Sequence, residues 1–346
     1  WRVAAGTLER THSFDVRIEG EAAAIDPEGV LSVPGGAARA DLVVVNDDDL
    51  TYAISRLDER STDVALAYVG TIDTAITRAV IWASLWNAVR DGLLDPRRFI
   101  AAVLTAVPTE TEPAIRDRLL LFVSEALSSF LPGSLRGHVH DQVLATTIRL
   151  SRETEDSDAW RSYTRAFIAE FSARGAQEHE ATVRGFAASD DPDIAWRARR
   201  ALAARGLVDT GAIEAWRNAD GSGEAARMSV EALASLPLEE ARSHAWEAVY
   251  SESLSNDFLT ATLAGLNASS WDGESGIDSA VERLRSYWES HTIGMALRYA
   301  NGVLGYGLDI DREGSVERSV GLLRGWLDAH GDAPGQYGAA APEHLR

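Results

Sequence analysis

The sequence contains no cysteine, and this absence excludes several kinds of chemistry. A chain without thiols forms no disulfide, binds no metal through cysteine and offers no thiol nucleophile. Long apolar runs are missing too, because no segment approaches the roughly 18 apolar residues of a membrane-spanning helix. The chain also does not open with a secretory leader. We therefore expect no membrane span, and the cytoplasm is the default compartment.

Positive charge is scarce. The chain has 33 Lys and Arg residues against 53 Asp and Glu residues, which gives a formal net charge of −20. A surface this acidic repels phosphate backbones, so nucleic acid is a poor candidate partner. The same charge attracts cationic groups weakly, for example the amino terminus of a peptide.

What is present is enough chain for a large core. At about 150 residues per domain, 346 residues correspond to roughly two domains. Trp1 begins inside an apparent strand and no initiating methionine precedes it. We therefore expect this chain to be part of a longer polypeptide.

The apolar pattern changes its period at residues 42–60, LVVVNDDDLTYAISRLDER. Before this stretch, apolar and polar residues alternate, as at Val16, Arg17 and Ile18, and glycine and proline mark turns. The run Leu42 to Val45 is typical of a buried strand. These features predict three or four strands in residues 1–49, forming a small and incomplete β-sandwich.

From residue 50 to residue 346 the apolar positions recur every three to four residues, which predicts helices. Asp95-Pro96, Glu112-Pro113 and Asp191-Pro192 each place a capping residue before a proline at the first helical position. One expected apolar stripe comprises Ile72, Ala75, Ile76, Ala79, Val80, Ala83, Trp86 and Val89. Two others comprise Ile115, Leu119, Phe122, Val123, Ala126, Leu127 and Phe130, then Trp160, Tyr163, Phe167 and Phe171.

About a dozen helices with short connections make sequential helices antiparallel neighbours. Residues 191–206 and 223–249 are similar to HEAT-type helix pairs, although no strict repeat is visible. The prediction is a mainly α fold, an irregular HEAT-like superhelix of antiparallel helix pairs with a concave face. An irregular bundle is the alternative.

No candidate metal site satisfies its motif. His179-Glu180 begins like the zinc helix H-E-x-x-H, but Val183 occupies the position of the second histidine, so we expect a solvated helix surface. His138 and His140 are two residues apart and point in different directions on a helix. We expect both at the surface, near the start of a helix.

The run Asp47-Asp48-Asp49 lacks the alternating acids, the glycine and the final glutamate of a calcium loop. It predicts a turn with a carboxylate at a helix N-cap. The dinucleotide-binding fingerprint occurs in reversed order at Gly302, Gly305 and Gly307, and no βαβ unit surrounds these glycines. This pattern favours a break between helices.

Trp82 and Trp86, four residues apart, favour core packing over an aromatic ligand patch. No G-x-S-x-G elbow is present, and no serine can be paired with a histidine and an acid. We therefore name no catalytic or metal-binding residue, and the sequence leaves substrate-binding residues unidentified.

The string at residues 42–61 resembles the junction segment of bacterial, particularly actinobacterial, aminopeptidase N enzymes, which are gluzincin zinc metallopeptidases. In that family a similar stretch ends a small β-sandwich and leads into a C-terminal helical domain. Residues 1–3, 10–19 and 41–45 look like the closing strands of that sandwich. Residues 78–94, RAVIWASLWNAVRDGLL, are similar to the first long helix of the helical domain.

The resemblance implies a zinc aminopeptidase, a hydrolase that removes N-terminal residues from peptides. The family's H-E-x-x-H helix, its distant glutamate ligand and its G-x-M-E-N segment are absent here, so zinc is expected only in an upstream catalytic domain. This chain should then be inactive alone. Its helices would form a bowl that covers the active site, limits peptide access and contacts the distal end of the peptide.

A different reading is an independent HEAT-like scaffold that binds a partner protein on its concave face. It is motivated by a long helical array without catalytic residues. The upstream reading frame discriminates the two hypotheses, because an H-E-x-x-H segment there would reject the scaffold.

Overall fold

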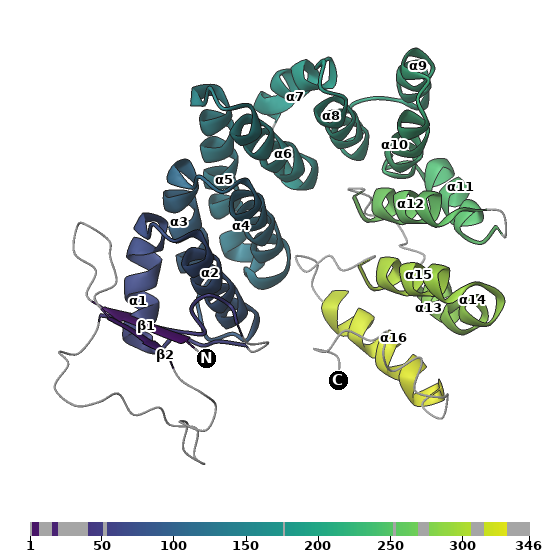
Figure 1. Ribbon diagram of the computed structural model, residues 1–346. Helices are drawn as coiled ribbons and strands as arrows, with labels where there is room; N and C mark the ends of the chain where they lie inside the picture. Colours follow the sequence, from purple (N-terminus) through teal and green to yellow (C-terminus); the bar gives the residue numbers. More distant parts are fainter. Residues whose placement is uncertain are drawn as a thin grey trace. The chain divides into compact units, whose positions relative to one another are not determined.

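A computed structural model describes residues 2–6, 16–19, 41–50, 54–175, 177–251, 254–268, 277–305 and 315–330. Within these ranges the chain is mainly α-helical, which confirms the predicted fold class (Figure 1). Two compact units divide it, Trp1–Ala166 and Phe167–Arg346. None of the described helices is long and apolar enough to cross a membrane.

Three short strands precede the helices and form one antiparallel sheet in the order β2-β1-β3. They are β1 (Arg2–Gly6), β2 (Val16–Glu19) and β3 (Leu42–Val45). The register pairs Val3 with Val45 and also with Ile18, so β1 is the central strand. Strands were therefore predicted correctly in these places, whereas the predicted turns at 26–29 and 34–36 lie outside the described residues.

The described residues of the first unit form six α-helices, the last of which continues into the second unit. They are α1 (Glu59–Tyr68), α2 (Ala75–Arg90), α3 (Pro96–Ala106), α4 (Pro113–Glu125), α5 (Gly133–Glu153) and α6 (Ser157–Arg174). Helix begins at Glu59 rather than near residue 50, because Asp58 is the residue whose carboxylate caps the Ser61 amide at 2.9 Å. The domain boundary at residues 49 and 50 stays a prediction.

Aromatic side chains fill the core of the first unit. Trp86 stacks on Phe122 with ring centroids 4.4 Å apart, and Phe99 packs against both Trp86 and Trp82. Trp82 and Trp86 are both buried. Their predicted role in core packing is therefore confirmed.

The predicted stripe on α2 is only partly right. Val80, Trp86 and Val89 are buried, but Ile76 is 40% exposed and Ala83 is also exposed. Helix α2 is enclosed on most of its circumference, and polar Thr77, Arg78 and Ser84 lie on its buried side. Neighbours pack around a central helix from several directions, so its apolar residues do not mark a single face.

The second unit continues as helix pairs. Its helices are α7 (Glu180–Ala187), α8 (Pro192–Ala204), α9 (Thr210–Asp220), α10 (Gly223–Ala234), α11 (Glu239–Val249), α12 (Asn256–Ala268), α13 (Ile277–Glu282), α14 (Leu284–Ser290), α15 (Ile293–Gly305) and α16 (Ser315–His330). Helix α10 packs between α8 and α12, and α12 packs on α15 (Figure 1). Helices α7, α9, α11 and α14 pack beside these four helices as partners. The HEAT-like label itself stays a prediction.

The proline motifs start helices as expected. Asp95 caps α3 through the Arg97 amide at 2.9 Å, and Asp191 caps α8 through the amides of Asp193 and Ile194. Glu112 precedes Pro113 of α4 without a side-chain cap, and its own amide donates to Glu110 Oε1 at 2.9 Å.

Close helix contacts in the second unit depend on glycine. A Cβ on Gly265 of α12 would lie 2.3 Å from the carbonyl oxygen of Glu231 in α10. A Cβ on Gly302 of α15 would lie 2.7 Å from Leu263 Cδ1 of α12. The missing side chains therefore set the spacing of α10, α12 and α15.

Candidate functional site

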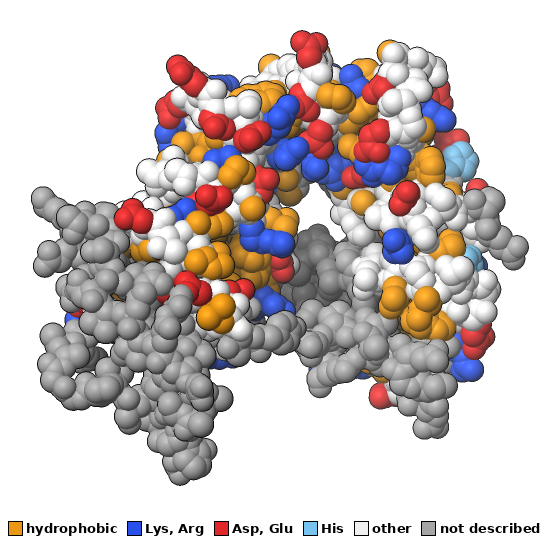
Figure 2. All heavy atoms as spheres, viewed as in Figure 1, with side chains coloured by type: hydrophobic (Ala, Val, Ile, Leu, Met, Phe, Trp, Pro, Cys, Tyr) orange, Lys and Arg blue, Asp and Glu red, His pale blue; other side chains and the backbone are white. Residues whose placement is uncertain are grey.

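An open groove of about 880 Å³ lies in the second unit where α10, α12 and α15 run side by side. Its lining is mixed, with arginine, aspartate, glutamate, asparagine and threonine side chains around a few apolar ones. Figure 2 shows a similar interspersion of positive and negative side chains over the described surface in view. The groove therefore offers a polar surface of both signs and not an apolar slot.

Helix α10 supplies Glu224 and Arg227 to the groove. Ser222 caps this helix through the Ala225 amide at 3.0 Å, which places Glu224 in the first turn, where the helix dipole favours negative charge. Arg227 lies three residues later on the same face and donates from Nε to Glu224 Oε2 at 3.2 Å. This hydrogen bond raises the pKa of Arg227 and lowers the pKa of Glu224.

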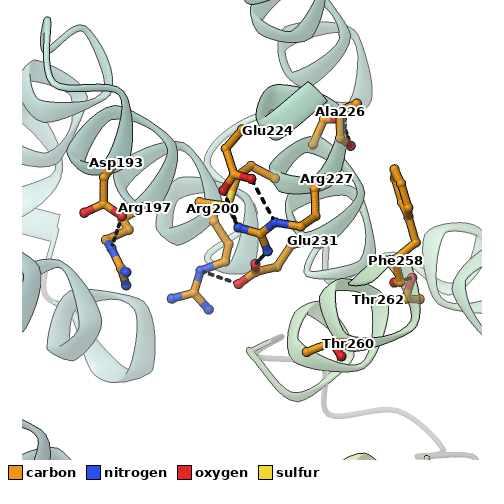
Figure 3. A network of polar contacts seen from close by, with 12 residues as sticks. Asp193, Arg197, Arg200, Glu224, Ala226, Arg227, Glu231, Phe258, Thr260 and Thr262 are labelled. Carbon is orange, nitrogen blue, oxygen red and sulfur yellow. Dashed lines mark hydrogen bonds and ion pairs between the residues drawn. The ribbon is translucent and has the colours of Figure 1, made fainter. Parts of the chain in front are cut away.

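Charged contacts extend from the groove to helix α8. Arg227 Nη1 lies 3.8 Å from Glu231 Oε2, and Arg200 Nε of α8 lies 3.3 Å from Glu231 Oε1 (Figure 3). Burial lowers the pKa of Arg200, and the nearby Glu231 carboxylate opposes that effect. One glutamate therefore bridges two arginines and holds α8 and α10 at a fixed spacing.

Helix α12 contributes Asp257, Thr260 and Asn267 to the groove. The Thr260 hydroxyl donates to the Asn256 carbonyl at 2.9 Å, which leaves its oxygen available as an acceptor. The Asn267 amide nitrogen donates to the carbonyls of Leu263 and Gly302, at 2.9 and 3.1 Å, and so joins α12 to α15.

Helix α15 contributes Arg298 and Asn301. Arg298 Nη1 donates to the Gly294 carbonyl at 2.9 Å. Among the described residues no carboxylate lies within ion-pair distance of this guanidinium, unlike those of Arg200 and Arg227.

A second cavity, of about 540 Å³, lies in the first unit between α1, α2 and the loop after α2. Leu57, Leu85 and Leu94 give it an apolar wall. Its arginines are already engaged, because Arg98 pairs with Asp63 at 2.6 Å and Arg56 pairs with Asp91 at 2.8 Å. Neither arginine at this cavity is therefore without an acidic partner.

The predicted solvated surface at His179-Glu180 is only partly observed. The His179 side chain is 22% exposed and its ring packs edge-on against Phe167, with centroids 5.4 Å apart. Glu180 pairs with Arg184 at 2.8 Å, and Val183 is fully buried. His179 is therefore a packing residue at the start of α7.

His138 and His140 both lie on α5, as expected, but only His138 is exposed. The expected surface position of His140 is wrong, because this residue is 2% exposed. Residues two apart on a helix are about 200° apart around its axis, so one faces solvent while the other faces the core. The two imidazoles therefore do not share a side of α5.

The turn predicted at the three aspartates is confirmed, since the Asp49 amide donates to the Asn46 carbonyl at 3.0 Å. The expected helix N-cap is wrong. Asp47 is fully buried and accepts a 2.5 Å hydrogen bond from the Thr77 hydroxyl in the first turn of α2. Asn46, Asp48 and Asp49 adopt positive φ angles of 60°, 67° and 51°, which short polar side chains tolerate best. Asp47 thus ties the end of the sheet to α2.

The expected helix break at the glycines is wrong for Gly302, which lies inside α15 and permits the close approach of α12. Gly305 is the last residue of α15. Gly307 lies outside the described residues.

No group of three or more His, Asp or Glu side chains gathers as a metal site in the described part of the chain.

The groove was not predicted from the sequence. Glu224, Arg227 and Glu231 do carry a signal, because their i, i+3 and i+4 spacing places alternating charges on one helix face. The position of Arg298 at the groove could not be predicted, because it depends on the packing of α12 against α15 and no local pattern encodes that packing.

Known proteins resemble most of this chain. The family model described as the ERAP1-like C-terminal domain matches residues 42–304. A protein named Aminopeptidase N, from Streptomyces lividans, is 30% identical over 86% of this chain. The match covers 35% of that protein, so the chain spans about a third of the length of this curated relative.

Proposed function

Because the chain belongs to the family of ERAP1-like C-terminal domains, we propose that it is the non-catalytic C-terminal domain of a zinc aminopeptidase. The single observation that carries this proposal is the 30% identity to the Streptomyces Aminopeptidase N over 86% of the chain. The parent enzyme would be a metallopeptidase that removes N-terminal residues from peptides. The family assignment favours this reading over an independent scaffold.

The catalytic domain of the same polypeptide is the proposed partner, and it would hold the zinc ion. That domain would lie upstream, where the resemblance puts the H-E-x-x-H helix. Peptides are the proposed substrates, and the cytoplasm is the proposed compartment, which fractionation of source cells would test.

The proposed role of this chain is to cover the active site, limit access to it and contact the distal end of the peptide. The polar groove on α10, α12 and α15 supports this role. An extended peptide backbone presents alternating donors and acceptors. The groove offers matching groups, such as the Thr260 hydroxyl oxygen, the Asn301 amide and the Arg298 guanidinium.

A first experiment uses the 346-residue chain alone. Bound zinc is measured by elemental analysis, and the release of Ala or Leu from aminoacyl amides is assayed. We expect no substantial turnover. Stoichiometric zinc together with turnover would overturn the proposal, because the active site would then lie in this chain.

A second experiment uses the full-length enzyme encoded by the complete reading frame. Ala264→Trp places a large side chain in the groove. The variant should lower kcat/KM for a ten-residue peptide more than for Leu-amide, which has no distal residues. Equal effects on both substrates would contradict a role in contacting the distal end, and Gly185→Ala on α7 is the matched control outside the groove.

A further inference from the structure

The cavity of the first unit has an apolar side that is open to the surroundings. Leu57, Leu85 and Leu94 form its wall, and Leu93 also lines it. Leu85 and Leu94 are buried, whereas the Leu93 side chain is 69% exposed. Exposed apolar surface that continues a buried apolar wall is typical of a site for a partner.

The turn after α2 holds Leu93 in this exposed position. Gly92 has a φ of 70°, the left-handed conformation that commonly ends a helix, and its amide donates to the Val89 carbonyl at 3.0 Å. The Leu93 amide donates to the Ala88 carbonyl at 2.8 Å. In such a turn the residue after glycine frequently packs back on the helix. Here it stays exposed, so a hydrogen-bonded backbone presents an apolar side chain outward.

A second exposed apolar side chain lies on the neighbouring segment. Arg56 Nη2 lies 2.8 Å from Asp91 Oδ2, so the segment before α1 is joined to the end of α2. Ile54 comes two residues before Arg56, and Leu93 comes two residues after Asp91. Among the described residues of the first unit, Ile54 (72% exposed) and Leu93 are the two most exposed large apolar side chains. The two therefore flank one ion pair.

The charges around this surface nearly balance. Arg56 and Asp91 neutralise each other. Arg98 Nη2 lies 2.6 Å from Asp63 Oδ1, which makes a second neutral pair. Glu59, in the first turn of α1, is the remaining acid that lines the cavity. A partner can therefore cover this surface with few uncompensated charges, as the core of an interface requires.

We propose that Ile54, Leu93 and the cavity wall form the docking surface for the catalytic domain of the same polypeptide. The inference rests on the proposed function, which puts that domain in one chain with this one. The greater part of the Streptomyces relative lies outside the match, because the match covers 35% of it. Ile54 belongs to the segment that connects β3 to α1. A covalently joined domain is presented at an effective concentration on the order of millimolar, which favours it over a second copy of this chain.

The lack of cysteine provides a direct test. Leu93→Cys gives the 346-residue chain a single thiol, which lies at the docking surface. The matched control is Leu238→Cys, at a side chain that precedes α11 in the second unit and is 49% exposed. Each variant is made in the 346-residue chain and in the full-length enzyme. Mass spectrometry of the peptide that carries the substitution follows its alkylation by iodoacetamide, so other cysteines in the full-length enzyme do not interfere.

We expect the Leu93→Cys thiol to react about tenfold more slowly in the full-length enzyme than in the 346-residue chain, because only the undocked fraction reacts. The Leu238→Cys thiol should react at similar rates in both. Equal rates for Leu93→Cys in the two proteins overturn the inference. Protection in the 346-residue chain that increases with its concentration also overturns it, because the occupant would then be a second copy.

Leu93→Asp provides an independent measurement by calorimetry. In the 346-residue chain this substitution should leave the unfolding temperature unchanged, because the side chain is exposed there. In the full-length enzyme it should lower the unfolding temperature, because docking would bury an unpaired carboxylate. Leu238→Asp is the control and should change neither protein. Equal shifts for Leu93→Asp in both proteins overturn the inference.

The outcome separates this inference from the proposed function. If the full-length enzyme holds zinc and releases N-terminal residues while Leu93→Cys reacts at equal rates in both proteins, the proposed function stands and the docking surface fails. If Leu93→Cys is protected in a full-length protein that neither holds zinc nor releases N-terminal residues, the docking surface stands and the proposed function fails.

Discussion

The guanidinium of Arg78 and the carboxylate of Glu110 are joined by two hydrogen bonds inside the first unit, Nε to Oε2 at 2.9 Å and Nη2 to Oε1 at 2.6 Å. Their side chains are 7% and 1% exposed. Arg78 also donates to the Ile72 and Asp73 carbonyls, at 2.7 and 3.0 Å, so it fastens the segment before α2 to the segment after α3. Most of its hydrogen-bonding capacity is therefore used within the protein.

Glu110→Gln should destabilise the chain by about 3–5 kcal/mol, because it leaves the Arg78 charge buried without its counterion. Urea denaturation measures the change in the free energy of unfolding. Asp63→Asn is the matched control, since it removes the acid of the exposed pair with Arg98 and should cost less than about 1 kcal/mol. Equal losses for the two variants would contradict this account.

Gly265→Ala should destabilise the chain by about 1–3 kcal/mol, because its Cβ would collide with the Glu231 carbonyl oxygen of α10. The control is Gly185→Ala in α7, where an added Cβ meets nothing within 4 Å. That substitution should stabilise the chain by about 0.5–1 kcal/mol through helix propensity. Thermal unfolding of both variants shows whether the two substitutions change stability in opposite directions. A Gly265→Ala variant as stable as the parent chain would show that α10 and α12 can separate at little cost.

Trp86→Ala should cost about 3–5 kcal/mol, since it empties the space between Phe99, Phe122 and Phe130. Trp86→Phe, which keeps an aromatic ring, should cost less. Leu121→Ala on α4 is a control at a side chain that is 54% exposed, with an expected change within about 0.5 kcal/mol. Denaturant midpoints compare the three, and similar midpoints for Trp86→Ala and Leu121→Ala would refute the packing argument.

Alkaline pH should weaken the second unit through Tyr287. Burial raises the pKa of this phenol to about 12, against 10.0 for an unperturbed tyrosine. The folded state therefore favours the neutral phenol, and its contribution to stability is complete below pH 10 and is lost as the pH rises from about 10 to about 12. Burial also raises the pKa of Tyr299, whose ring stacks on Tyr287 with centroids 4.1 Å apart.

Tyr287→Phe isolates this contribution, because the buried Tyr287 hydroxyl has no hydrogen-bond partner among the described residues. The variant should match the parent chain in stability near neutral pH and lose less stability between pH 10 and pH 12. Urea midpoints measured across that range give the comparison. If the urea midpoints of the two proteins fall equally between pH 10 and pH 12, ionisation of Tyr287 does not contribute to the loss of stability.

The sequence predicted the class of fold because its signals are local. Asp95-Pro96 and Asp191-Pro192 start helices through contacts made within three residues. The period change at residues 42–60 likewise separates strand from helix by spacing alone. These predictions required no knowledge of which helices become neighbours.

Predictions that depended on neighbours were less accurate. His140 is buried because α5 turns that side toward the core, and Ile76 is exposed although it belongs to an apolar stripe. Gly302 was assigned to a helix break, since the sequence does not reveal that Leu263 packs against it. The groove was missed for the same reason, because its three helices meet only in the folded chain.

The shared carboxylate of Glu231 has a mechanical consequence. Arg227 and Glu231 both belong to α10, and Arg200 of α8 pairs with the same carboxylate, so a sideways displacement of α10 moves the charge on which Arg200 depends. Arg227 also lines the groove. A ligand that binds Arg227 would therefore change its contact with Glu231, and through Glu231 the pairing of Arg200 in α8. Trp196 of α8 also packs with Ala225 and Met228 of α10, so salt would weaken the charged link between the two helices without separating them.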